Sequence, residues 1–263
     1  MNKAYIYLLL IIFSTLISCQ EVINVDLNDI NPAIVIEGGI DNSGDPCIIK
    51  ITRSINFDDT NYFPPVNNAI VILSDNNGVI DTLSSADSGK YVGQIINGIP
   101  GNTYQLSIKI DNQTYTSISK MPDPVSFDSV NVDQILWFGS PRFLITAYFT
   151  DPVGIDNYYR FVVYRKGKPR SSIYVYTDEG NDGTVNTPSF LASSKIESGD
   201  TIDVEMQCID KNVYDYFFGL RQLTGTFFYQ SASPANPESN ILGGNGIGYF
   251  SAHTSERKTI IMP

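Results

Sequence analysis

Hydrophobic and polar residues alternate along most of the chain, which is the period-two pattern of half-buried β-strands. Short turn-forming segments such as Asn76-Asn77-Gly78 and Asp87-Ser88-Gly89 separate these runs. In the first half, the pattern predicts strands over residues 33–40, 47–54, 69–74, 90–95, 103–110 and 113–119. Strands this short and this closely spaced are typical of a β-sandwich.

The second half continues the pattern, with one interruption by a helix. Strands are predicted over 129–135, 142–150, 158–165, 172–176, 201–209 and 249–252. Residues 211–223 carry apolar side chains at helical spacing, and Asp210 precedes them as an N-cap. The Gly-, Asn-, Ser- and Pro-rich residues 231–248 are expected to form a long ordered loop or a mobile arm.

Met121-Pro122-Asp123-Pro124 is the best candidate for a linker, because two prolines stiffen the chain and cannot sit in a central strand. The predicted fold class is therefore all-β with two β-sandwich domains and one short amphipathic helix. The first domain spans residues 33–121, and the β-rich second domain spans 125–263 with its helix and tail loop. Gly89-Lys90-Tyr91 and the turn before Tyr104 resemble Ig-like and carboxypeptidase-regulatory modules.

The first 18 residues have the pattern of a signal peptide. Lys3 supplies a positive charge and residues 4–16 form an apolar run that is too short to span a bilayer. Leu16-Ile17-Ser18-Cys19 resembles a bacterial lipobox, which predicts cleavage between Ser18 and Cys19 and acylation of Cys19. Residues 19–32 then form a lipid-anchored linker. Gln20 favours the outer membrane and leaves the face open, surface or periplasmic.

Composition narrows the chemistry further. The 263 residues include 28 acidic and 17 basic side chains, a net charge of −11, which argues against nucleic-acid binding. The single His, His253, argues against most His-based catalysis and most zinc sites, and it is expected to be exposed or on an edge strand near the C-terminus. Cys47 and Cys208 share strand faces with apolar neighbours, so they are expected to be two buried free thiols in separate cores, with a disulfide as the alternative.

Several motifs together resemble one known family, the Bacteroidetes outer-membrane lipoproteins filed as domain of unknown function 4249. The resemblance covers nearly the whole mature chain and rests on Cys19, Ile34-Val35-Ile36-Glu37-Gly38, Asp151-Pro152, Asn157-Tyr158-Tyr159-Arg160, Ser198-Gly199-Asp200, Val213-Tyr214-Asp215-Tyr216 and Gly243-Gly244. It implies no catalytic residues. No cofactor is expected, with Ca²⁺ as the open alternative. The resemblance implies a membrane attachment and an accessory role beside a TonB-dependent transporter.

Three surface features are candidate sites. Asp178, Glu179, Asn181 and Asp182 concentrate oxygen ligands suited to Ca²⁺, although distant residues must complete the shell, and a solvated acidic turn is the alternative. Arg165, Lys166, Lys168 and Arg170 place four positive charges within six residues, which suits lipid phosphates or an acidic partner, or simply protects a sheet edge. Thr82, Ser129 and Thr201 each follow an Asp and precede an apolar residue, as in a Bacteroidetes O-glycosylation acceptor.

The sequence thus predicts a non-catalytic, lipid-anchored accessory component of an outer-membrane uptake system. The alternative is a stand-alone adhesin or glycan-binding module. A hydrolase using carboxylates such as Asp151 or Asp178 is the least favoured hypothesis, because no catalytic pair is visible in the sequence. The ligand, the partner and the occupancy of any metal site are not encoded in a recognisable motif.

Overall fold

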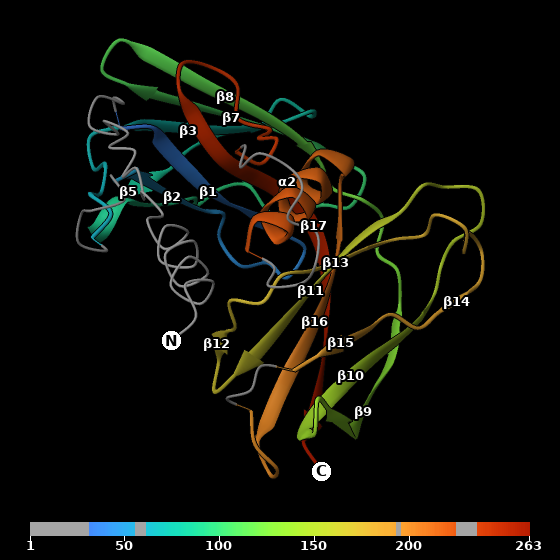
Figure 1. The fold of residues 1–263 in the computed structure, drawn as a ribbon. Helices are drawn as coiled ribbons and strands as arrows, with labels where there is room; N and C mark the ends of the chain where they lie inside the picture. The colour runs from blue at the N-terminus through green and yellow to red at the C-terminus, as the bar shows by residue number, and fades with distance from the viewer. Residues whose placement is uncertain (1–31, 56–61, 193–195, 225–235) are drawn as a thin grey trace, which may run out of the picture. The chain divides into compact units, whose positions relative to one another are not determined.

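The structure, a computed structural model, describes residues 32–55, 62–192, 196–224 and 236–263 (Figure 1). The described residues are mostly β with one α-helix, and the predicted β-sandwich fold class is confirmed. Cys19, Ser18 and the rest of the predicted leader and linker up to residue 31 lie outside the described residues. The strands are β1 Ile34–Asp41, β2 Ile48–Arg53, β3 Ile70–Asp75, β4 Ile80–Thr82, β5 Ser84–Ser85, β6 Lys90–Val92, β7 Thr103–Ile110, β8 Gln113–Lys120, β9 Phe127–Trp137, β10 Ser140–Thr150, β11 Tyr158–Arg165, β12 Lys168–Pro169, β13 Tyr174–Thr177, β14 Val185–Asn186, β15 Ser189–Leu191, β16 Thr201–Ile209 and β17 Gly246–Ile261.

The first hydrophobic core lies between two sheets. One is the sheet β4-β3-β7-β8, and the other is the β17-β1-β2-β6-β5 part of a nine-stranded sheet. Strand β7 has the alternation that the sequence pattern predicted for 103–110. It buries every second side chain and exposes or half-exposes those between. The buried members of this core include Ile36, Ile49, Tyr91, Leu106 and Phe250.

The second core lies between the β12-β11-β16-β17 part of the same nine-stranded sheet and a smaller sheet of β14-β10-β15 with β9 paired to β10. Aromatic rings fill it. Phe149 packs on Tyr159 with ring centroids 4.5 Å apart, and on Phe161 at 6.1 Å. Rings at these separations stabilise a core beyond the area that they bury.

Strand β17 belongs to both cores. Its residues from Gly246 to His253 pair in parallel with β1, and those from Thr254 to Ile261 pair antiparallel with β16. The predicted last strand at 249–252 is therefore far too short. Residues 246–252 pair with β1 and contribute to the first core, whereas the prediction assigned them to the second domain. The linker at residue 122 stays a prediction.

Glycines in the tail explain this error. A Cβ on Gly248 would lie 2.0 Å from the backbone oxygen of Ile36, so the glycine permits β17 to approach β1 closely. Glycine is common both in loops and where two strands approach closely, so the glycines at 246 and 248 favoured a loop in the sequence prediction. The neighbouring residues 225–235 lie outside the described part of the chain.

Helix α2 spans Lys211–Thr224, as predicted to within one residue. Asp210 caps it: its Oδ1 accepts the backbone N–H of Val213 at 3.0 Å. The Ser119 hydroxyl of β8 also donates to the Asp210 carboxylate. Asp210 therefore fastens the start of α2 to the edge of β8, in addition to satisfying the first turn of the helix.

We expect Asp210→Ala to lower the free energy of unfolding by about 2 kcal/mol, the upper end for a lost N-cap, because the Ser119 hydroxyl loses the acceptor for its proton as well. Urea unfolding followed by circular dichroism measures the loss. Asp210→Ser keeps a capping oxygen and should lose about half as much. Equal losses for the two variants would contradict the capping role.

Cys47 and Cys208 are free and buried, as predicted, and belong to the first and second core respectively. Burial raises the pKa of the Cys47 thiol to about 12 and also raises that of Cys208. We therefore expect both thiols to resist iodoacetamide at pH 8 in the native state and to react after denaturation. Intact mass of the Cys19→Ser variant, in which Cys47 and Cys208 are the remaining cysteines, is measured with and without a reductant. A single modification of this native protein would contradict the expectation.

No helix among the described residues is both long enough and apolar enough to cross a membrane.

Candidate functional site

The predicted acidic turn follows β13, and the structure places it beside the end of β10. Carboxylate oxygens of Asp151, Asp178 and Asp182 all lie within 4.8 Å of one another. Two of the four residues expected to bind a metal are therefore brought together, and the third member comes from a distant strand end. Glu179 is exposed and outside the group, and the Asn181 side chain donates to the Tyr176 hydroxyl instead.

Hydrogen bonds from the surrounding loops hold the three carboxylates in place. Asp178 accepts the backbone N–H of Asn157 at 2.9 Å, and Asp182 accepts that of Gly154 at 2.8 Å. Asp151 accepts the hydroxyl of Tyr159, whose pKa is raised chiefly by burial. The cluster thus links the β13–β14 turn to the loop after β10. With one oxygen from each carboxylate, the cluster offers three ligands to a cation, fewer than the six to eight that Ca²⁺ takes.

Burial raises the pKa of Asp178 above its usual value, with the charge of Asp151 adding to the effect. A carboxyl whose folded-state pKa is raised destabilises the fold when ionised, and this penalty disappears as the pH falls towards the unfolded value. We expect Asp178→Asn to gain stability relative to wild type at pH 7 and to lose this advantage near pH 4.

Thermal unfolding of both proteins between pH 4 and pH 8 measures this trend. The same experiment in millimolar Ca²⁺ tests the calcium hypothesis, because an ion held by the cluster would raise the wild-type Tm and leave that of Asp178→Asn unchanged. A difference between the proteins that is constant with pH would contradict the burial argument.

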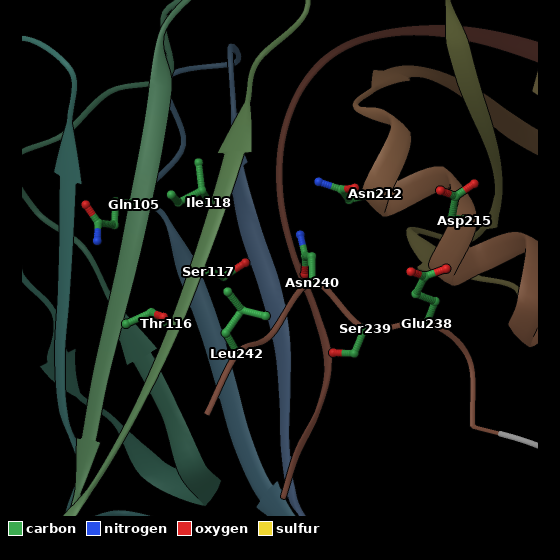
Figure 2. Close-up of a pocket in the computed structure, with 10 residues that line it drawn as sticks. All are labelled: Gln105, Thr116, Ser117, Ile118, Asn212, Asp215, Glu238, Ser239, Asn240 and Leu242. Atoms are coloured by element: carbon green, nitrogen blue, oxygen red, sulfur yellow. The ribbon is translucent and has the colours of Figure 1, made fainter. Parts of the chain in front are cut away.

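A pocket of about 250 Å³ lies between the outer edge of β8 and the start of α2 (Figure 2). The segment before β17 forms its third wall. Amides, hydroxyls and carboxylates line it together with two exposed apolar side chains, and its described lining includes no Lys, Arg or His. The lining residues are Gln105, Thr116, Ser117, Ile118, Asn212, Asp215, Glu238, Ser239, Asn240 and Leu242.

The pocket exists because the segment before β17 leaves β8 after a single bridge. Thr116 and Leu242 exchange both backbone hydrogen bonds at 2.8 Å. Two residues earlier, Asn240 instead turns its side chain to the backbone of Phe250, donating to its oxygen at 2.7 Å and accepting its N–H at 3.0 Å. Strand alternation directs the N–H and C=O of Ile118 to the same edge as those of Thr116, which is the edge that the pocket borders.

Two polar side chains of the pocket have contrasting environments. The Ser117 hydroxyl is buried and has no hydrogen-bond partner among the described residues. The Asp215 carboxylate pairs with the ammonium of Lys211 at 2.6 Å, one helical turn away. No sequence motif pointed to this pocket, because its walls come from three segments that are remote in sequence and individually ordinary.

The remaining predicted site residues are distributed over the surface. Lys166 and Lys168 are exposed at the β11–β12 turn, whereas Arg165 is half-buried and pairs with Asp200 at 2.8 Å. Arg170 donates its backbone N–H to Val163. The three predicted O-glycosylation residues, Thr82, Ser129 and Thr201, are all exposed, and their modification stays a prediction.

The expectation that His253 is exposed or on an edge strand is wrong. It sits within β17 opposite Asp41 of β1, and its Nδ1 lies 3.1 Å from the Ser251 hydroxyl. Burial lowers the pKa of this imidazole. The sequence offered no signal for this position, since it did not reveal that β17 is a central strand.

Comparison with known proteins places the chain in a family. No curated protein shows significant similarity to it. Among solved structures, a segment of two fibronectin type-III domains from chicken tenascin is 12% identical, with a TM-score of 0.22, over 68% of this chain and 91% of that one. The adhesin InvE of Yersinia pseudotuberculosis is 17% identical, also with a TM-score of 0.22. That match covers 66% of this chain and about half (54%) of InvE.

Likenesses this low leave the function to be argued from the chain's own residues. The family match is of a different kind, because a family model aligns with residues 20–259, nearly the whole of the chain after the predicted cleavage site. The chain therefore belongs to the family described as domain of unknown function (DUF4249).

Proposed function

We propose that the protein is a lipid-anchored, non-catalytic binding component of the bacterial cell envelope that assists a TonB-dependent outer-membrane uptake system. The observation that carries this proposal is the Leu16-Ile17-Ser18-Cys19 motif directly after an apolar run of signal-peptide length. Acylation of Cys19 would hold the protein at the outer membrane, where it could serve a transporter.

The absence of catalysis is argued from the carboxylates that the hydrolase hypothesis would need. Asp151 and Asp178 do lie close together, but they are only 2% and 5% exposed. Asp151 accepts the hydroxyl of Tyr159, and Asp178 accepts the backbone N–H of Asn157. A glycosidic bond has to reach both carboxyl groups of a catalytic pair. Side chains buried to this extent provide no such access.

The partner is tested by a pull-down of the full-length, tagged protein from its native membrane in mild detergent, with mass spectrometry of whatever co-purifies. We expect a TonB-dependent barrel in stoichiometric amount and an acyl mass on Cys19. The control is Cys19→Ser, which removes the acyl site and should separate the protein from the membrane. A lipoprotein recovered alone at several detergent strengths would refute the accessory role.

A stand-alone glycan-binding module is the second candidate, and the pocket between β8 and α2 favours it. Amide and carboxylate side chains beside an exposed apolar surface suit an uncharged polyhydroxylated ligand. Glycan-array binding by the full chain, abolished in Gln105→Ala and Asn212→Ala, would support this candidate. As a control, Asn77→Ala alters an exposed polar residue in the β3–β4 turn, outside the pocket.

A further inference from the structure

The turn between β9 and β10 carries an exposed apolar group. Leu136 is 78% exposed and Phe138 is 82% exposed, and Trp137 lies between them. The Trp137 and Phe138 rings contact edge to face, with centroids 5.3 Å apart. We call these three residues the aromatic tip. Adjacent large apolar side chains at the end of a hairpin do not contribute to either core and require another explanation.

The backbone conformation of this turn is unfavourable for phenylalanine at position 138. Phe138 and Gly139 have φ values of +47° and +78°, as the two central residues of a tight hairpin turn require. Asn-Gly is the pair that such a turn favours, and a bulky residue with positive φ is strained. Phe138 therefore belongs to neither core and occupies an unfavourable backbone conformation, although it is 82% exposed, so the needs of the fold do not explain its presence.

A second turn of the same kind carries positive charge. Lys166 and Gly167, between β11 and β12, have φ values of +52° and +70°. Lys166 and Lys168 are exposed, and Arg170 follows directly after β12. We call these three residues the basic tip. In a protein whose net charge is −11, they form a local site of opposite sign.

Both tips lie toward one end of the second sandwich. Arg165 pairs with Ile202, and the next residue of β16, Thr201, pairs with Ile261 at the end of β17. The basic tip is therefore near the C-terminal end of β17. Figure 1 shows the β9–β10 turn at the end of the sandwich where β17 finishes. Ile261, itself 67% exposed, adds apolar surface there.

We propose that this end of the second sandwich docks on an anionic lipid surface, with the aromatic tip in the headgroup region and the basic tip against lipid phosphates. Tryptophan prefers the interface between hydrocarbon and water, and lysine next to an acidic bilayer is attracted to it. The acidic remainder of the molecule is repelled from the same bilayer, which fixes the orientation. A convex aromatic turn fits a deformable lipid surface. The contact does not depend on acylation of Cys19.

Trp137 is the only tryptophan of the chain, so tryptophan fluorescence reports directly on the aromatic tip. The full-length protein is mixed with phosphatidylethanolamine vesicles that contain phosphatidylglycerol and brominated acyl chains, and Trp137 emission is recorded. We expect a blue shift and quenching by the brominated chains. Both should fall by about twofold or more when phosphatidylglycerol is omitted or when the salt concentration reaches about 1 M.

Variants separate the tips from the rest of the molecule. Phe138→Asn suits the turn and should preserve the fold while it reduces the quenching of Trp137 at least about twofold. Lys166→Asn with Lys168→Asn should do the same only on acidic vesicles. Ile70→Thr, at a residue of β3 that is 55% exposed and belongs to the other sheet pair, is the control and should change nothing.

Three results would overturn the proposal. The first is emission that shows no shift and no quenching on any vesicle. The second is quenching that is unaffected by Phe138→Asn and by salt. The third is a blue shift in native membrane fragments that pure lipid vesicles do not reproduce, which would assign the aromatic tip to a protein partner. The mass of acylated Cys19 is read separately, so failure of the anchor and failure of the tip are distinguishable.

Discussion

Replacing Gly248 with alanine should lower the free energy of unfolding by about 3 kcal/mol or more, or abolish folding. Gly248 has φ +112°, and a Cβ there would lie 2.0 Å from the backbone oxygen of Ile36. The obstacle is the neighbouring strand of the same sheet, so no side chain can move aside to relieve it. Parallel pairing of β1 with β17 would have to open, and both form part of the first core.

Gly78→Ala is the matched control for this prediction. Gly78 also has a positive φ, +83°, but nothing lies within 4 Å of the Cβ that alanine would add. Backbone strain alone should cost about 1 kcal/mol in this turn. Urea unfolding of both variants separates strain from steric overlap. Similar losses in the two would show that the approach of β17 to β1 is not the constraint.

Arg257→Ala should produce the second large effect, a loss of about 3 kcal/mol. Glu205 is only 2% exposed, and its Oε2 accepts from Arg257 Nε at 2.8 Å and Nη2 at 2.7 Å. Its Oε1 accepts from Gln207 at 2.6 Å. Removing the guanidinium leaves a buried carboxylate without its counter-charge, which costs more than the ion pair itself contributes. The expected loss is at the low end for such pairs because Arg257 is itself partly exposed.

A second substitution tests whether the uncompensated charge is the cause. Glu205→Gln in the Arg257→Ala background removes the buried charge and keeps the hydrogen-bonding shape, so it should recover most of the lost stability. Guanidinium unfolding at pH 7 provides the four values of the double-mutant cycle. A double variant that is as unstable as Arg257→Ala would instead point to the stacking of Arg257 over the Tyr164 ring, 4.4 Å away, as the main contribution.

Local patterns in the sequence predicted local structure well, because each depends on a few adjacent residues. Alternation in β7, the cap at Asp210 and the inward thiols of Cys47 and Cys208 all follow from neighbours within one strand or turn. The order of strands does not follow from such signals. Pairing of β17 with β1 joins residues from the two ends of the described chain, and the sequence of neither segment indicates which strand it pairs with.

In the candidate sites too, residues close together in the sequence could be predicted, whereas those brought together by the fold could not. Asp178 and Asp182 lie four positions apart and were found, whereas Asp151 joins them only through the path of the chain. Sequence reasoning anticipated that distant ligands would be needed but could not name them. The pocket beside β8 escaped prediction altogether, since it depends on where the segment before β17 separates from the strand edge.

The position of β17 also constrains when the protein can fold. Strand β1 is among the first described segments to emerge during synthesis, yet its parallel partner is among the last. Until β17 is available, the edge of β1 is unpaired and the first core lacks Phe250 and Ala252. The amino-terminal half therefore cannot complete its structure before β17 has been made, and pairings this remote in sequence form slowly. Closure of the first core is thus a late event in folding, although most of its strands are among the earliest described segments to be synthesised.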